Sequence, residues 1–175
     1  MDTLQDLISK LLLINKPINI YIELLDKYLP EELDLLFYHV FDITFTKEEL
    51  ELKNRRIHQL EFRNNIIDRY RVCIITKFPN LMCEACHIIP FCDSTETQKY
   101  DVNNGLLLEA GIHKLFDLYL ISINPYKKTV ELSKQLLNDI EYNQLHKYHN
   151  MKISLHNNTL EYLKTHYKLF SRSIT

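Results

Sequence analysis

The feature that most constrains the fold is a change in the pattern of apolar residues after Arg71. Before this point, the spacing of Thr46 and Glu49 matches a capping box, which predicts a long helix that starts there and continues to about Tyr70. After it, the apolar segments are short and are separated by polar turns. A long helix followed by short strands and turns predicts an α+β fold.

The region after this helix is expected to contain a β-branched segment, a polar loop, an apolar run, a helix and a hairpin. In chain order these are Val72–Thr76, 93–104, Leu106–Leu108, Ala110–Leu118 and 119–132. The hairpin prediction depends on Asn124-Pro125, a turn signal that separates two apolar segments. His87 is expected to end a strand and enter the loop.

Helices are expected on both sides of this mixed region. Apolar residues from Leu4 to Leu12 repeat at helical spacing, and a run at 31–41 follows Pro30 with acidic residues in its first turn. The tail predicts two more helices, at 131–146 and 156–170. The chain therefore divides into a helical N-terminal segment, a mixed core and a helical tail, over residues 1–60, 61–132 and 133–175.

The net charge of −2 conceals a segregation of charge along the chain. Basic side chains are in excess at 51–77 and 126–175, and acidic side chains are in excess between them. This pattern fits a phosphate-binding rim around a metal-binding centre, and it fits unevenly charged helix faces equally well. The basic residues chosen as candidates for nucleic-acid contacts are Arg63, Arg69, Arg71 and Lys114.

Targeting signals and membrane segments are not evident in the sequence. The sequence contains no run of about 18 apolar residues, the length that a membrane span needs. Acidic residues precede the apolar run Leu11–Ile14, which is unlike a secretory signal. An intracellular protein, cytoplasmic or nuclear, is therefore expected. The clustering of all four cysteines then indicates metal binding or site thiols more than disulfides; they are Cys73, Cys83, Cys86 and Cys92.

Two histidines stand out by their neighbours. His113 and Asp117 are four residues apart on an expected helix, so both side chains project from one face and could hold a divalent cation or form a surface ion pair. His87 lies between a cysteine and Ile-Ile-Pro, where it is either a structural residue or a catalytic base. The tail histidines fit solvated helix positions; they are His146, His149, His156 and His166.

Taken together, three motifs in a fixed order resemble the HNH endonuclease family of the ββα-metal superfamily. They are CHIIPF from Cys86, DVNNGLLL from Asp101 and HKLFD from His113, followed by LISI in the expected hairpin. They are most similar to the subgroup with His-Ile-x-Pro, Asn-Gly-Leu-x-Leu and His-x-Leu-Phe-Asp. The resemblance covers about 62–132 and implies a ββα-metal core whose lead-in helix and first strand lie in FRNNIIDRYRVCIIT.

The resemblance also implies roles for individual residues. His87 matches the general base that takes a proton from the attacking water, and Asn104 matches the residue that orients this histidine or the metal-bound groups. His113 matches a metal ligand, and Asp117 falls where a further ligand is often found. The implied activity is hydrolysis of DNA phosphodiester bonds, double-stranded DNA being favoured, with one divalent metal that stabilises the phosphate and the leaving 3′ oxygen.

The chain departs from this family at two positions. Many relatives carry Asp or His directly before the catalytic histidine as a metal ligand, whereas this chain has Cys86. If Cys86 only packs in the core, Mg²⁺ or Mn²⁺ is expected; if it is a ligand, its thiolate favours Zn²⁺ or another transition metal. The family's usual glycine after Leu-Phe-Asp is also absent, since Leu118 and Tyr119 follow, which is expected to alter the hairpin.

Two further functions are compatible with the sequence. One is a non-catalytic nucleic-acid-binding module on the same scaffold. The other is a zinc-stabilised interaction protein in which the cysteines are structural and the N-terminal helices bind a partner. A homodimer through these helices would let two sites address both strands of a duplex.

Overall fold

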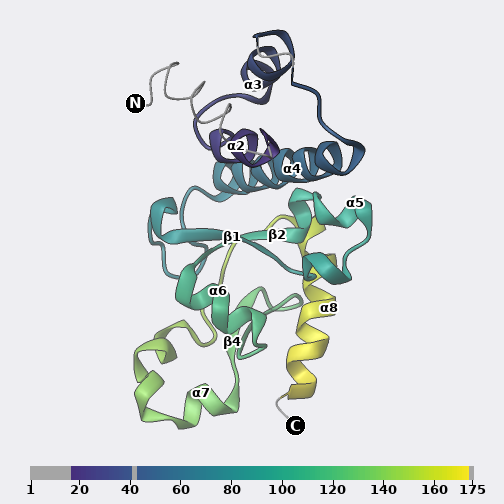
Figure 1. Cartoon of the computed structure of the whole chain (residues 1–175). Coiled ribbons are helices and arrows are strands. Elements are labelled where there is room, and N and C mark those ends of the chain that lie inside the picture. The colour runs from purple at the N-terminus through teal and green to yellow at the C-terminus, as the bar shows by residue number, and fades with distance from the viewer. Residues whose placement is uncertain (1–16, 41–42, 174–175) are drawn as a thin grey trace. The chain divides into compact units, whose positions relative to one another are not determined.

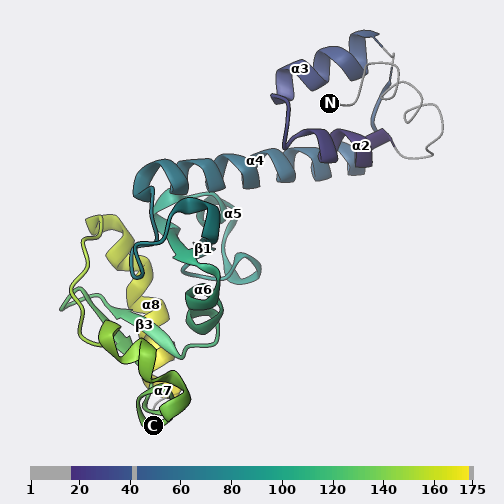
Figure 2. The same ribbon diagram turned by 90° about the vertical axis from the view of Figure 1, so that its left-hand side faces the viewer.

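The computed structural model describes residues 17–40 and 43–173 (Figures 1 and 2). The chain forms two compact units, one that ends at Glu61 and one that begins at Phe62. The helix expected at Leu4–Leu12 lies outside the described residues. Among the residues that the structure describes, no helix has both the length and the apolar character that a bilayer crossing requires.

The first unit is helical over its described residues. It contains α2 (Pro17–Leu24), α3 (Pro30–Asp34), a π-helix η1 (Leu35–Val40) and the first part of α4 (Lys47–Tyr70). Both α2 and α3 begin with a proline. Proline is favoured at this position because the first N–H groups of a helix have no acceptor within the helix, so its missing N–H costs no hydrogen bond. Their apolar faces enclose an aromatic core in which the rings of Tyr21 and Phe37 meet edge-on at 5.1 Å.

The long helix α4 begins as the sequence predicts. The Thr46 N–H donates to Glu49 Oε2 at 2.9 Å, and the Glu49 N–H donates to Thr46 Oγ1 at 3.3 Å. This reciprocal pair is the predicted capping box, and it satisfies two N–H groups at the start of the helix. The helix ends at Tyr70, and Arg71 takes a left-handed backbone conformation with φ 61°.

The second unit contains a ββα element. Strands β1 (Cys83–His87) and β2 (Gly105–Glu109) pair antiparallel, with His87 opposite Gly105, and α6 (Ala110–Asp117) follows β2 directly. In Figure 1 the two strands lie side by side with α6 next to them. Leu106, Leu107 and Leu108 on β2 are fully buried. The α+β fold is confirmed, and the apolar run after Gly105 forms the buried strand β2.

The family resemblance predicted a first strand that includes Val72–Thr76, but this segment is not a strand. It forms a closed turn, in which the Cys73 N–H donates to the Phe78 carbonyl and the Lys77 N–H donates to the Cys73 carbonyl. Lys77 adopts φ 64°, which turns the chain away from an extended path. Only Val72 forms a bridge, with Pro79, before the 3₁₀ helix η2 (Asn80–Met82), so the first strand begins at Cys83.

The hairpin is confirmed as β3 (Ile121–Asn124) paired with β4 (Thr129–Leu132). The single helix expected at 131–146 is wrong. Residues up to Leu132 belong to β4, after which α7 (Lys134–Asn138) starts from the cap of Ser133 and stops at Asp139. Asp139 is extended and its side chain instead caps a 3₁₀ helix, η5 (Ile140–Tyr148). The last expected helix is confirmed as α8 (Asn157–Ser173).

One tail histidine is buried, which the solvated-helix interpretation did not anticipate. His166 on α8 is 3% exposed, and its ring stacks on Phe116 of α6 at 3.6 Å. His166 Nε2 donates to the Phe116 carbonyl at 3.0 Å, and Nδ1 lies 2.9 Å from Ser122 Oγ on β3. His166 therefore ties α8 to both α6 and the hairpin. Figure 2 shows α8 beside β3.

This histidine should make the fold sensitive to mild acid. Burial lowers the pKa of His166 to about 4, below the ordinary 6.5 of an unfolded chain. Between these values the unfolded state binds the proton and the folded state does not, so the contribution is full above pH 6.5 and is lost as the pH falls towards 4. Urea unfolding should show about 2 kcal/mol lost through His166 between pH 7 and pH 5.

The matched variant is His166→Gln, whose amide can still donate to the Phe116 carbonyl but does not titrate. The prediction concerns the difference in pH dependence between the two proteins, not their absolute stability. If both lose the same free energy between pH 7 and pH 5, His166 is not responsible.

Candidate active site

The end of β1 and one face of α6 place three reactive side chains around one pocket. His87 is the last residue of β1, and His113 and Asp117 are four residues apart on α6. All three line the same surface pocket, together with Phe91 and Tyr119. The structure thus brings His87 together with two residues of α6 that lie far from it in the sequence.

His87 is held rigidly by its surroundings. Its ring stacks on Phe62 at 4.2 Å with an interplanar angle of 7°, and Phe91 meets it edge-on at 5.7 Å. His87 Nε2 lies 2.8 Å from the carbonyl oxygen of Lys99. Because a carbonyl oxygen only accepts, Nε2 carries the hydrogen and Nδ1 keeps its lone pair.

The environment favours the neutral form of this imidazole. Burial lowers the pKa of His87 below its ordinary value; the hydrogen bond to Lys99 opposes this effect, and the nearby His113 adds to it. A neutral ring with a free Nδ1 is the form that can accept a proton from water.

Gly105 leaves room for the ring of Phe62, on which the ring of His87 stacks. A Cβ at this position would lie 2.8 Å from Phe62 Cζ and closer still to the Ile66 side chain. Real side chains do not tolerate such distances, so any other residue would displace Phe62, on which His87 stacks. The glycine opposite His87 is therefore required by packing, with no need for an unusual backbone angle.

Asn104 is fully buried, and its amide fastens the loop that follows β1. Its Oδ1 accepts from the Ile89 N–H at 2.8 Å. Its Nδ2 donates to the carbonyls of Ile89 at 3.3 Å and Gln98 at 3.1 Å, and to Ser94 Oγ at 3.3 Å. Asn104 thus fixes the loop at Gln98, and the carbonyl of the following residue, Lys99, binds His87.

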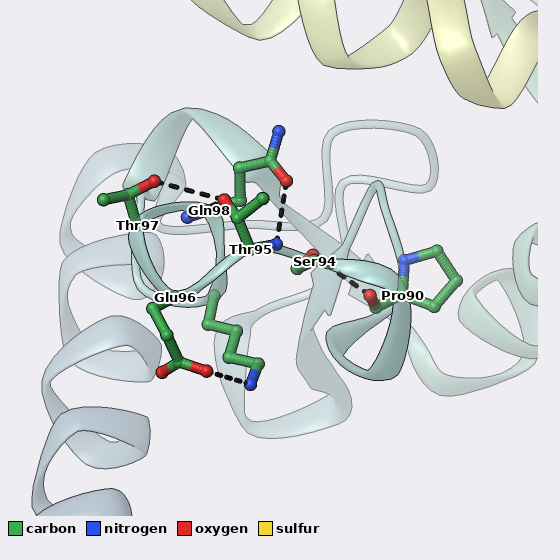
Figure 3. Close-up of polar contacts among 7 residues, drawn as sticks. Pro90, Ser94, Thr95, Glu96, Thr97 and Gln98 are labelled. Atoms are coloured by element: carbon green, nitrogen blue, oxygen red, sulfur yellow. Dashed lines mark hydrogen bonds and ion pairs between the residues drawn. The ribbon is translucent and has the colours of Figure 1, made fainter.

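The loop itself consists of the 3₁₀ helix η3 (Phe91–Asp93), α5 (Glu96–Lys99) and the 3₁₀ helix η4 (Val102–Asn104). Figure 3 shows its internal bonds: the Ser94 hydroxyl donates to the Pro90 carbonyl at 3.0 Å, and the Thr95 N–H donates to Gln98 Oε1 at 3.0 Å. These bonds turn the stretch predicted only as a polar loop into a compact support.

His113 lies between two carboxylates. Its Nδ1 is 2.5 Å from Glu84 Oε2 on β1, and its Nε2 is 3.4 Å from Asp117 Oδ2 on α6. The Glu84 carboxylate therefore accepts a hydrogen bond from the Nδ1–H of His113, and Nε2 faces Asp117. Metal-binding histidines are commonly oriented in this way by a carboxylate on the other ring nitrogen.

Cys86 lies at the same place, fully buried on β1. One ligand atom each from Cys86, His113 and Asp117 can be chosen so that all lie within 4.8 Å of one another. Burial, with the negative charges of Asp117 and Glu84, raises the pKa of the Cys86 thiol well above its ordinary value. The thiolate form therefore needs a positive charge beside it.

These residues fit a divalent metal by the chemistry of their donors. A sulfur, an imidazole nitrogen and a carboxylate oxygen converge, and because Nδ1 of His113 is bound to Glu84, the nitrogen available to a metal is Nε2, which faces Asp117. Catalytic metal sites typically have three protein ligands and a fourth coordination position that is open to the substrate pocket.

The candidate basic residues have different surroundings. Arg69 is committed to the fold, because its Nη1 donates to the Val102 carbonyl at 3.1 Å and to Asn103 Oδ1 at 3.2 Å. Arg63, Arg71 and Lys114 are exposed. A nucleic-acid contact by any of these residues stays a prediction.

The remaining cysteines do not join the reactive cluster. Cys73 and Cys83 are buried, and Cys92 is exposed. Within residues 17–40 and 43–173, the one group of three or more potential ligands is that of Cys86, His113 and Asp117. A zinc site made by all four cysteines therefore has no counterpart in the described part of the chain.

Sequence reasoning missed several residues that shape the site. Glu84 could have been noticed, since it precedes Cys86 by two residues and so projects from the same face of β1. The contributions of Phe62 and the Lys99 carbonyl depend on folding and left no local signal. Tyr119 occupies the left-handed position after α6, at φ 54°, yet the hairpin still forms.

Comparison with known families agrees with this geometry. The family model described as HNH endonuclease matches residues 73–124, the stretch that contains β1, β2, α6 and β3. No curated protein matched the chain. The ββα arrangement of β1, β2 and α6 agrees with this match, so residues 73–124 resemble an HNH endonuclease domain. The match points to a nuclease type of function.

Proposed function

We propose that the protein is a metal-dependent endonuclease that hydrolyses phosphodiester bonds in DNA. The observation that carries the proposal is the free Nδ1 of a rigidly held, neutral His87 in the same pocket as His113 and Asp117. A base and a group of metal ligands around one open pocket are the two parts that such a hydrolysis requires.

The residues would divide the work as follows. His87 Nδ1 takes the proton of a water molecule, while its Nε2–H stays on the Lys99 carbonyl and keeps the ring in place. His113 and Asp117, with Cys86, hold the metal. When bound, a divalent metal offsets the charge of the phosphate and stabilises the leaving 3′ oxygen. The products are a 5′-phosphate and a 3′-hydroxyl end.

Double-stranded DNA is the proposed substrate, and exposed Arg63, Arg71 and Lys114 are the proposed phosphate contacts. Phosphate contacts of this kind fix the position of a duplex without reading its sequence. The expected homodimer through the N-terminal helices, and the cytoplasmic or nuclear location, stay predictions.

Removal of the metal tests the proposal directly. Purified protein is incubated with supercoiled plasmid or with single-stranded DNA, in Mg²⁺, Mn²⁺, Zn²⁺ or excess EDTA. We expect nicked or linear plasmid with at least one metal, none in EDTA, and recovery when metal is added back. The cut ends should be ligatable, as 5′-phosphate and 3′-hydroxyl ends are. Cleavage that continues in EDTA, or that no metal supports, would contradict the proposal.

A further inference from the structure

We propose that the metal site is a thiolate site, formed by Cys86 Sγ, His113 Nε2 and the Asp117 carboxylate, that selects a transition metal of the zinc and cobalt class over magnesium. The inference rests on the proposed function and deepens it by naming the class of metal. It also assigns Glu84 as the residue that orients His113.

The positions of the donors support a small, closely bound ion. The three ligand atoms lie within 4.8 Å of one another, and His113 Nε2 is already 3.4 Å from Asp117 Oδ2. In a tetrahedral zinc shell, with bonds of about 2.0–2.3 Å, neighbouring donors are about 3.5 Å apart. Asp117 is exposed at the end of α6, so its side chain can rotate to close the remaining gap.

The kind of donors argues against magnesium. Mg²⁺ requires near-octahedral oxygen ligands and retains several waters, whereas this group offers one carboxylate, one imidazole and one thiol. A thiolate favours zinc, cobalt and similar ions strongly. Cys86 is also fully buried, and its Sγ, which donates to the His87 carbonyl at 3.3 Å, lies within 4.8 Å of a ligand atom of each of the other two residues, so bulk water does not compete for it.

Glu84 completes the arrangement from outside the ligand set. Its carboxylate binds His113 Nδ1, which fixes both the ring orientation and the tautomer that leaves Nε2 as the donor atom. Without an ion, the same contact could be an ordinary ion pair. The two cases differ in a measurable way, since only a positioning role makes metal affinity depend on Glu84.

Cobalt titration of the full chain tests the proposal without any cleavage assay. We expect a thiolate-to-cobalt charge-transfer band in the near ultraviolet, one equivalent per chain, that Zn²⁺ abolishes and a large excess of Mg²⁺ leaves unchanged. The band should be absent in Cys86→Ala and in the closer isostere Cys86→Ser, and present in Cys83→Ala, a matched control for a buried cysteine on the same strand.

Affinity measurements test the role of Glu84. Glu84→Ala should weaken cobalt binding by about 10–100-fold. Glu161→Ala, which removes an exposed carboxylate paired with Lys164 on α8, should leave it unchanged. Thermal melting of every variant shows whether it is folded. A folded Cys86→Ala protein that keeps the charge-transfer band, or wild-type protein that shows none, would overturn the thiolate site, and equal affinity in Glu84→Ala would overturn the positioning role.

The outcomes separate this inference from the proposed function. If the protein binds cobalt through Cys86 but cleaves no DNA, the thiolate site stands and the nuclease proposal is wrong. If the protein cleaves DNA with Mg²⁺ and gives no thiolate band, the nuclease proposal stands and the thiolate site is wrong.

Discussion

Replacing His87 with alanine should lower the single-turnover rate of DNA cleavage by about 10²–10⁴-fold, the usual contribution of a general base. The variant loses Nδ1, the atom that accepts the proton of water, but keeps all of the metal ligands. Cobalt or zinc affinity should therefore be nearly unchanged while cleavage is lost. The measurement is the rate of cleavage at saturating protein, with metal affinity determined in parallel.

A matched control is available in His156→Ala. His156 is an exposed histidine at the start of α8 and does not line the pocket that contains His87. Its replacement should leave the rate unchanged, which excludes a general effect of histidine loss. Because His87 also stacks on Phe62, thermal melting must show that His87→Ala is folded at the assay temperature. A folded His87→Ala protein that cleaves at the wild-type rate would remove His87 from the mechanism.

The sequence predicted those elements whose signals are local. The capping box at Thr46 and the turn at Asn124-Pro125 each involve residues a few positions apart, and both elements form where expected. The single helix at 131–146 failed because Leu132 pairs with Ile121 across the hairpin, a contact that helical periodicity does not report. Tertiary pairing overrode local preference there.

The same distinction applies to the site. The motif order singled out His87, His113 and Asp117, and the structure shows that they line one pocket. Glu84 and His166 were missed because their importance depends on partners 29 and 50 residues away in the sequence. A buried histidine and an exposed one look alike in a helical pattern. Only the packing of α8 against Phe116 separates them.

The second large effect is expected at Asn104. Replacing it with alanine should lower the free energy of unfolding by about 3 kcal/mol, because several hydrogen bonds of about 0.5–1.5 kcal/mol each are lost from one fully buried amide. Asn103→Ala is the matched control. Asn103 is only partly buried, and its side chain contacts Asp101 and Arg69 at the edge of the same turn. It should cost about 1 kcal/mol.

Asn104→Ala should also impair cleavage when it is fully folded. The lost bond to the Gln98 carbonyl releases the loop that carries the Lys99 carbonyl, and this carbonyl holds His87 Nε2. Misplacement of a reacting group by about 1 Å can cost about 100-fold in rate. We therefore expect a loss of about 10–100-fold at a temperature well below the melting point of the variant, with metal affinity retained because Cys86, His113 and Asp117 lie outside this loop. Wild-type cleavage by a folded but destabilised Asn104→Ala protein would restrict Asn104 to a role in stability.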